Sequence, residues 1–204
     1  LNKVRLGADI LSTAPSIRLI CEAATGFDNI DLDYCRKKGI AVCNVVGYST
    51  PCVAQLTLTM ALSLVTRLPE YNQFVKSGEY TRLGIPNRLS PVFHEIAGKT
   101  WGIIGYGNIG KQVAQCADAL GCRVIVHKRR PIAERPCLSL DEVCRNADIL
   151  SIHTPLNEET RNLLDRTQIA KLKSNAVVIN VARGAVTDEA ALAEAVAQRR
   201  IGGL

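Results

Sequence analysis

Gly102-Ile103-Ile104-Gly105-Tyr106-Gly107-Asn108-Ile109-Gly110 carries three glycines in the pattern Gly-x-Gly-x-x-Gly, at the point where an apolar strand gives way to an amphipathic helix. Gly105 permits the tight turn that leaves the strand, and Gly107 lets the backbone approach a pyrophosphate. Gly110 lets the helix lie close to the sheet. In this context the pattern predicts a dinucleotide-binding turn, with an ordinary glycine-rich turn as the alternative.

The residues on either side of the glycines have the pattern of a βαβ unit. Residues 99–104 and 122–126 form short apolar runs, as buried parallel strands do. Between them apolar residues recur at helical spacing, and Gly121 is a suitable C-terminal cap. Strand, helix and strand within about 30 residues match the length of such a unit. The amides near Asn108 and Ile109 would then face an anion at the positive end of the helix dipole.

The end of the second strand carries the residues that choose between the two nicotinamide cofactors. An NAD site places an Asp or Glu roughly 20 residues beyond the glycines, where it binds the ribose 2′-hydroxyl. Here residues 127–130 are His-Lys-Arg-Arg, and no acidic residue follows until Glu134. Lys128 and Arg129 would attract a 2′-phosphate, which a carboxylate would repel. The sequence therefore predicts NADP over NAD, with a solvated basic loop as the alternative.

Composition argues against several classes of partner. The net charge of +6 is scattered apart from residues 127–130, and no basic stripe is interleaved with aromatic residues. This distribution argues against binding to nucleic acid. No apolar run reaches the roughly 18 residues of a membrane span, and no signal peptide is visible at the start of the sequence. We therefore expect no nucleic-acid and no membrane partner.

The eight cysteines do not have the spacing of a disulfide framework or a metal site. They include no Cys-x-x-Cys pair, and the histidines are not spaced as metal ligands, so we expect no metal. Cys21, Cys43, Cys116 and Cys122 lie in apolar strand or helix patterns. We therefore predict buried free thiols in a reducing, cytoplasmic compartment.

Two regions of different organisation are expected along the chain. Residues 1–46 contain a small strand-helix-strand unit, with its elements at residues 17–21, 31–38 and 40–46. Residues 52–67 form a long helix that is apolar around most of its circumference, which predicts burial at an interface or in a core. Residues 68–98 are more polar and irregular.

Beyond residue 99 strands and helices alternate regularly. The further elements expected are strands at residues 148–153 and 176–181 and helices at residues 160–171 and 188–199. Such alternation predicts an α/β fold of the Rossmann type, a doubly wound parallel sheet covered by helices on both faces. Ligands of doubly wound sheets bind beyond the carboxyl ends of the strands.

Two of these carboxyl ends carry polar side chains. Residues 153–156 are His-Thr-Pro-Leu, and residues 180–184 are Asn-Val-Ala-Arg-Gly. The guanidinium of Arg183 could bind a carboxylate and polarise an adjacent carbonyl for hydride attack, with a surface cation at a strand end as the alternative. His153 either contacts the cofactor or is only a polar lining residue.

Five motifs that occur in order carry a resemblance to a known family. They are residues 24–31 (Ala-Thr-Gly-Phe-Asp-Asn-Ile-Asp), residues 53–55 (Val-Ala-Gln), the glycine run at 105–110, residues 153–156 with Glu159-Thr160-Arg161, and residues 180–184. Together they resemble the D-isomer-specific 2-hydroxyacid dehydrogenases. Tyr48-Ser49-Thr50 and the basic cluster are most similar to the glycerate dehydrogenase or hydroxypyruvate/glyoxylate reductase branch.

The resemblance implies a role for each motif. The amides around Thr25 and Gly26 would hold the carboxylate of a small 2-keto or 2-hydroxy acid, and Arg183 would be the catalytic arginine. Further cofactor contacts are implied for Gly105, Gly107, Asn108, Ile109, Gly110, Lys128, Arg129, His153, Thr154, Pro155, Val181 and Ala182. Residues 1–46 would be part of a smaller flavodoxin-like substrate domain. Residues 47–204 would be the dinucleotide-binding domain, with a dimerisation arm at residues 52–98 that builds a homodimer.

The sequence also departs from the family pattern. Members use an Arg, a Glu and a His, in which the His donates the proton to the carbonyl oxygen. None of the three histidines here matches the catalytic position, so the resemblance implies a chain truncated at both ends, without that His and Glu. Loss of such a proton donor costs roughly 10²–10⁴-fold in rate. A dinucleotide-binding sensor or corepressor, like the related C-terminal-binding proteins, is the alternative to an enzyme.

Overall fold

Strand β3 (Thr100–Ile104) lies inside a four-stranded parallel sheet in the computed structural model, which describes residues 1–130 and 132–204. The strand order is β4-β3-β5-β6. The other three strands are β4 (Arg123–His127), β5 (Ile149–Ile152) and β6 (Val177–Asn180). All five residues of β3 and all four of β5 are buried, because helices cover both faces of the sheet. This explains why the strands are continuous apolar runs without alternation.

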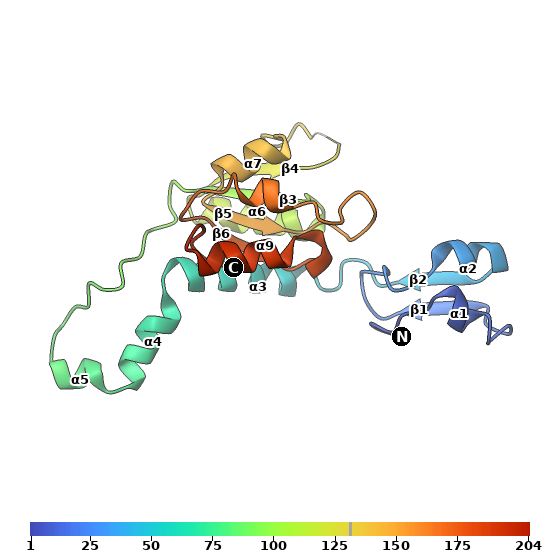
Figure 1. The fold of residues 1–204 in the computed structure, drawn as a ribbon, viewed down its shortest axis with the longest axis horizontal. Helices are drawn as coiled ribbons and strands as arrows, with labels where there is room; N and C mark the ends of the chain where they lie inside the picture. The colour runs from blue at the N-terminus through green and yellow to red at the C-terminus, as the bar shows by residue number, and fades with distance from the viewer. Residues whose placement is uncertain (131) are drawn as a thin grey trace.

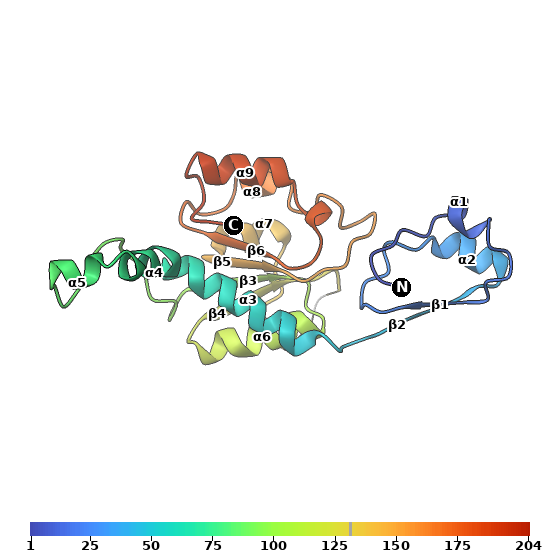
Figure 2. The ribbon, with the colours of Figure 1, turned by 90° about the horizontal axis from the view of Figure 1, so that it is seen from below.

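Helices pack on both faces of this sheet, as Figure 2 shows. On one face lie α3 (Thr50–Val65) and α6 (Asn108–Ala119), whose small buried residues Ala54 and Ala114 share a core with Trp101. On the other face lie α7 (Leu140–Asn146), α8 (Arg166–Ile169) and α9 (Glu189–Ala197), which share a second core with the sheet. A short 3₁₀ turn, η1 (Gly184–Val186), precedes α9. The predicted doubly wound α/β sheet is confirmed.

The first part of the chain forms a separate two-stranded parallel sheet, seen at the right of Figure 1. Its elements are α1 (Ala8–Leu11), β1 (Leu19–Glu22), α2 (Leu32–Lys38) and β2 (Ala41–Asn44). Asp31 caps α2 by accepting a hydrogen bond from the amide of Tyr34 at 2.9 Å, and Gly39 ends it with a φ of +67°. The strand-helix-strand pattern predicted for residues 17–46 is therefore present, with shorter strands.

The segment after α3 is more regular than predicted. It contains α4 (Leu68–Lys76) and α5 (Glu79–Leu83), so the prediction of an irregular 68–98 segment is wrong for its first half. The glycines that suggested irregularity only end these helices: Gly78 and Gly84 adopt φ values of +75° and +60° at the two ends of α5. Figure 1 shows α4 and α5 projecting away from the sheet.

The helix predicted at residues 160–171 is also wrong. Only α8 forms there, because the hydroxyl of Thr160 bonds to the carbonyl of Pro155 and to Asn157, and Asn162 has a φ of +51°. Side-chain bonds of this kind compete with helix formation. Conversely, α7 was not predicted. Its first turn carries the sequence Ser-Leu-Asp-Glu, which is the pattern of a capping box, and Ser139 and Glu142 form that box in the structure.

Helix α3 is less buried than its composition suggests. Ala54, Thr57 and Ala61 are buried, whereas the side chains of Leu56 and Met60 are exposed. One side of the helix therefore lies in the core, and burial of its exposed side at an interface remains a prediction. Among the described residues no single helix is long and apolar enough to cross a membrane. Only α3 and α4 taken together pass that test of length and composition, and they are bent by 69°.

All eight cysteines are free thiols, but they are not all buried. Cys35, Cys122 and Cys144 are buried, whereas Cys21, Cys43 and Cys52 are exposed, so the prediction of burial is wrong for these three. Cys21 and Cys43 are exposed because side chains alternate along β1 and β2: Ile20 and Val42 pack in the core under the helices, so their neighbours face away from it.

Candidate functional site

The glycine turn between β3 and α6 has the geometry that its pattern predicts. Gly105 has a φ of +92°, and a Cβ added there would lie 2.8 Å from the carbonyl carbon of His153. A Cβ added at Gly110 would lie 2.2 Å from the carbonyl oxygen of Gly105, so the first turn of α6 is in close contact with the glycine turn. At Gly107 an added Cβ would meet no atom of a described residue within 4 Å. The space at Gly107 is therefore open beside the start of α6, where turns of this pattern bind a phosphate.

The sheet places this turn at its topological switch point. The chain passes from β3 to β4 on one side and then crosses to β5 on the other side of β3. The ends of β3 and β5 are in register, and the amide of His153 donates to the carbonyl of Ile104 at 2.7 Å. Segment 153–156 and the glycine turn therefore lie next to each other, where such folds bind dinucleotides.

His153 belongs to a buried chain of hydrogen bonds. The indole N–H of Trp101 donates to Oγ of Ser151 at 2.9 Å, and that hydroxyl lies 3.0 Å from Nε2 of His153. Because an indole only donates, the Ser151 proton is free to bond Nε2; in that arrangement the imidazole proton lies on Nδ1. Burial lowers the pKa of His153 to about 4, so the ring is neutral at pH 7.

Nδ1 of His153 is buried and has no hydrogen-bond partner among residues 1–130 and 132–204. A buried N–H without a partner is costly, and in native proteins it usually has an explanation. At the switch point of the sheet the explanation that fits is an acceptor atom of a bound dinucleotide. The glycine turn and this donor together fit a dinucleotide, without distinguishing NAD from NADP.

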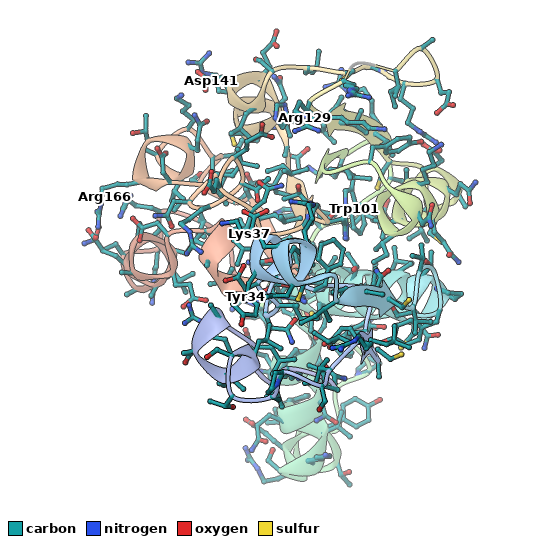
Figure 3. All side chains as sticks on the ribbon, turned by 90° about the vertical axis from the view of Figure 1, so that its right-hand side faces the viewer. Tyr34, Lys37, Trp101, Arg129, Asp141 and Arg166 are labelled. Carbon is teal, nitrogen blue, oxygen red and sulfur yellow. The ribbon has the colours of Figure 1, made fainter. Side chains whose placement is uncertain are left out.

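The basic loop after β4 is anchored to α6. Arg135 donates from Nε to the hydroxyl of Tyr106 at 2.7 Å and forms a two-pronged ion pair with Asp118. Within this loop Lys128 is half-buried and makes no ion pair with a described residue, whereas Arg129 is exposed and pairs with Glu159. Figure 3, which looks at this end of the molecule, labels Arg129.

The turn after β6 orients Arg183. The side chain of Asn180 accepts from the amide of Ala182 at 3.0 Å and donates to the carbonyl of Arg183 at 2.9 Å. The guanidinium reaches across to the N-terminal unit, where Nε and Nη2 lie 3.0–3.3 Å from the carboxylate of Asp28. Arg183 also lines a cavity of about 670 Å³ between α3, β6 and α9.

The loop after β1 presents backbone amides to this arginine. The hydroxyl of Thr25 donates to the carbonyl of Val45 at 3.0 Å, and Asn44 donates to the carbonyl of Thr25 at 2.8 Å. The amides of Thr25 and Gly26 donate no hydrogen bond to any described residue. A Cβ added at Gly26 would lie 2.2 Å from Nη2 of Arg183, so the guanidinium rests against the glycine. Free amides beside a guanidinium suit a carboxylate.

Sequence reasoning gave no role to several residues that the structure places here. Asp28 and Asn180 lie inside motifs that carried the resemblance, yet only the fold shows that they hold Arg183. Ser151 is a polar residue in the otherwise apolar strand β5, and this was the signal for its hydrogen bond with the indole of Trp101. In the part of the chain that the structure describes, no group of three or more His, Cys, Asp or Glu side chains could hold a metal ion.

Comparison with known proteins decides the family. Residues 58–204 match the family described as "D-isomer specific 2-hydroxyacid dehydrogenase, NAD binding domain". The chain belongs to this family. It therefore contains the NAD-binding domain of a D-2-hydroxyacid dehydrogenase, as the glycine turn and the strand order indicate.

Individual D-2-hydroxyacid dehydrogenases and their structural neighbours extend the match over nearly all of the chain. The glyoxylate reductase of Aeropyrum pernix is 39% identical over 200 residues, which cover 94% of this chain and 59% of that protein. The crystal structure of D-lactate dehydrogenase from Aquifex aeolicus, complexed with NAD and lactic acid, has a TM-score of 0.90 at 36% identity, over 98% of this chain and 60% of that one. An acyclic imino acid reductase in complex with NADPH and D-Arg has a TM-score of 0.89 at 27% identity, and the match covers 99% of this chain and 65% of that one. The chain thus spans 59–65% of the length of these relatives.

The burial of His153 predicts a pH-dependent stability. Its pKa is about 4 in the folded chain against 6.5 for a free side chain, so between these pH values the unfolded chain binds more protons. The free energy of unfolding should therefore fall by up to about 3 kcal/mol as the pH drops from 6.5 to 4. His153→Gln should abolish this part of the decrease in the free energy of unfolding. The measurement is urea unfolding at several pH values between 4 and 7. His94→Gln, at an exposed site, is the control, and an unchanged pH dependence in His153→Gln would contradict the assignment.

Proposed function

We propose that the protein to which this chain belongs reduces a small 2-keto acid, such as glyoxylate or hydroxypyruvate, to the D-2-hydroxy acid with NADPH, reversibly. The observation that carries this proposal is the meeting of Arg183 with the free amides of Thr25 and Gly26 at the carboxyl end of the sheet. A glyoxylate reductase and a D-lactate dehydrogenase among the similar proteins support the substrate class.

The proposed cofactor site draws on both sides of the switch point. The pyrophosphate would lie at Gly105, Gly107 and Gly110, against the amides of Asn108 and Ile109. The other proposed cofactor contacts are Lys128, Arg129, His153, Thr154, Pro155, Val181 and Ala182. NADPH, when bound, supplies the hydride. Residues 47–204 would be the cofactor domain and residues 1–46 part of the substrate domain.

The residues of this chain bind and orient the substrate in the proposed reaction. The amides of Thr25 and Gly26 would donate to the carboxylate, and Arg183 would contact both the carboxylate and the carbonyl oxygen. The positive charge of Arg183 stabilises negative charge as it develops on that oxygen. His153 is half-buried and neutral at pH 7, and a neutral imidazole is a poor proton donor. We assign the proton donor to no residue of this chain.

The function is tested by NADPH calorimetry and by glyoxylate-dependent oxidation of NADPH on the same sample. We expect NADPH to bind and Arg183→Gln to leave its affinity within about twofold. The rate should fall by about 10²–10³-fold, the usual cost of losing such a group. Arg145→Gln, at a surface ion pair on α7, is the matched control. Absence of NADPH binding would contradict the proposal, whereas NADPH binding with little turnover is expected of a chain that lacks the proton donor.

A preference for NADPH over NADH is proposed from the basic loop. The similar structures hold NAD in one case and NADPH in another, so this chain's own residues must decide. Lys128→Ala and Arg129→Ala should each weaken the binding of NADPH by roughly three- to tenfold and leave the affinity for NADH unchanged, because only NADPH carries the 2′-phosphate. Arg145→Ala is the control. Equal effects on both cofactors in calorimetry would contradict this preference.

We propose that the arm of α4, α5 and the following segment pairs with a second copy of the chain. Its exposed apolar side chains are Leu68, Val75, Tyr80, Leu83, Ile85, Leu89, Val92 and Phe93. Exposed patches of this kind mark protein interfaces. Sedimentation should show a homodimer that Leu89→Lys with Val92→Lys converts to a monomer. Val196→Lys, at an exposed position on α9, should leave the dimer intact, and a monomeric wild type would contradict the proposal.

We propose a cytoplasmic location on the basis of the thiols. All eight cysteines are free, and several lie at exposed positions such as Cys21, Cys43 and Cys52. Exposed free thiols persist in a reducing compartment, where glutathione and thioredoxin keep them reduced.

A further inference from the structure

Asp28 and Arg183 lie 155 residues apart in the sequence and meet between the two parts of the fold. Asp28 follows β1 in the N-terminal sheet, and Arg183 follows β6 in the larger sheet. Nη2 of Arg183 lies 3.0 Å from Oδ1 of Asp28, and Nε lies 3.1 Å and 3.3 Å from the two carboxylate oxygens. The carboxylate therefore binds the Nε and Nη2 side of the planar guanidinium.

The ion pair with Asp28 leaves some N–H donors of Arg183 without a partner. A guanidinium has five N–H groups in a fixed plane. Nη1 donates to the carbonyl of Ala182 at 3.0 Å, and Asp28 occupies the Nε side. One N–H on each of Nη1 and Nη2 remains without a partner among the described residues. Since Nη2 also rests against Gly26, these donors belong to the same pocket as the free amides of Thr25 and Gly26.

The pair is only partly screened by solvent. The side chain of Asp28 is 28% exposed and that of Arg183 is 45% exposed. A carboxylate this close cancels much of the field of the guanidinium, and an arriving anion meets an arginine that is oriented but partly neutralised. A substrate carboxylate would then bind more weakly than it would to a free arginine, and a product with the same carboxylate would leave more easily.

We propose that Asp28 is the positioning residue of Arg183: it fixes the plane of the guanidinium and moderates the affinity of the site for carboxylates. This inference rests on the proposed function, because it takes Arg183 as the group that binds substrate. Asp28 acts through Arg183 and does not itself touch the substrate. Removing its charge while keeping its shape should therefore tighten carboxylate binding, and only when Arg183 is present.

The test is a double-mutant cycle on the complete chain with oxamate, an unreactive 2-keto acid analogue that carries one carboxylate. Calorimetry at saturating NADPH compares the wild type, Asp28→Asn, Arg183→Gln and the double variant. We expect Asp28→Asn to bind oxamate about three- to tenfold more tightly than the wild type. In the Arg183→Gln background Asp28→Asn should change oxamate affinity by less than about twofold. Asp33→Asn, at an exposed ion pair with Arg36 on α2, is the matched control and should match the wild type.

The outcomes separate this inference from the proposed function. Weaker or unchanged oxamate binding in Asp28→Asn would overturn the inference, because a residue that only supports the loop would weaken the site when replaced. An equal gain in both backgrounds would overturn it too, since Asp28 would then repel the ligand directly. If the wild type binds NADPH and oxamate while the cycle shows no coupling, only the inference fails. If no variant binds NADPH or oxamate, the proposed function fails as well.

Discussion

The close approach of two backbone segments at the end of the larger sheet constrains the rest of the site. The turn after β3 touches the start of segment 153–156 so closely that a Cβ on Gly105 would lie 2.8 Å from a backbone carbon. This contact requires a left-handed glycine, starts α6 against the turn and puts its first amides at the switch point. The open space at Gly107 and the half-buried imidazole of His153 lie beside the same contact.

The buried chain from Trp101 through Ser151 to His153 is the exception to an otherwise apolar core. A serine inside a buried strand costs stability unless both sides of its hydroxyl are used, and here the indole donates and the imidazole accepts. With the Ser151 proton on Nε2, the imidazole proton lies on Nδ1, which has no partner among the described residues and is left to bond a bound molecule or water. Local conflict of this kind is typical of functional sites.

The sequence predicted those features that depend on local pattern and missed those that depend on distant partners. The strands of the larger sheet and the glycine turn were predictable because a buried parallel strand is a continuous apolar run, and the turn needs glycine at fixed spacing. The helix at residues 160–171 was mispredicted because apolar spacing does not show that Thr160 bonds to Pro155. The exposure of Cys21 depends on which face of a two-stranded sheet the helices cover. Asp28 was unpredictable as a partner of Arg183 because 155 residues separate them.

The arginine that the proposal places against the substrate carboxylate is already paired with a carboxylate from another loop. Arg183 pairs with Asp28, and both side chains are partly screened from solvent, whereas the exposed pair of Arg129 with Glu159 constrains its arginine little. An arginine at the rim of a site has many rotamers, and fixing it beforehand removes an entropy cost that ligand binding would otherwise carry. The carboxylate also offsets part of the positive charge, which lowers the gain from a ligand anion. Orientation and moderation of affinity are thus two consequences of one ion pair, and a site that must release its product benefits from both.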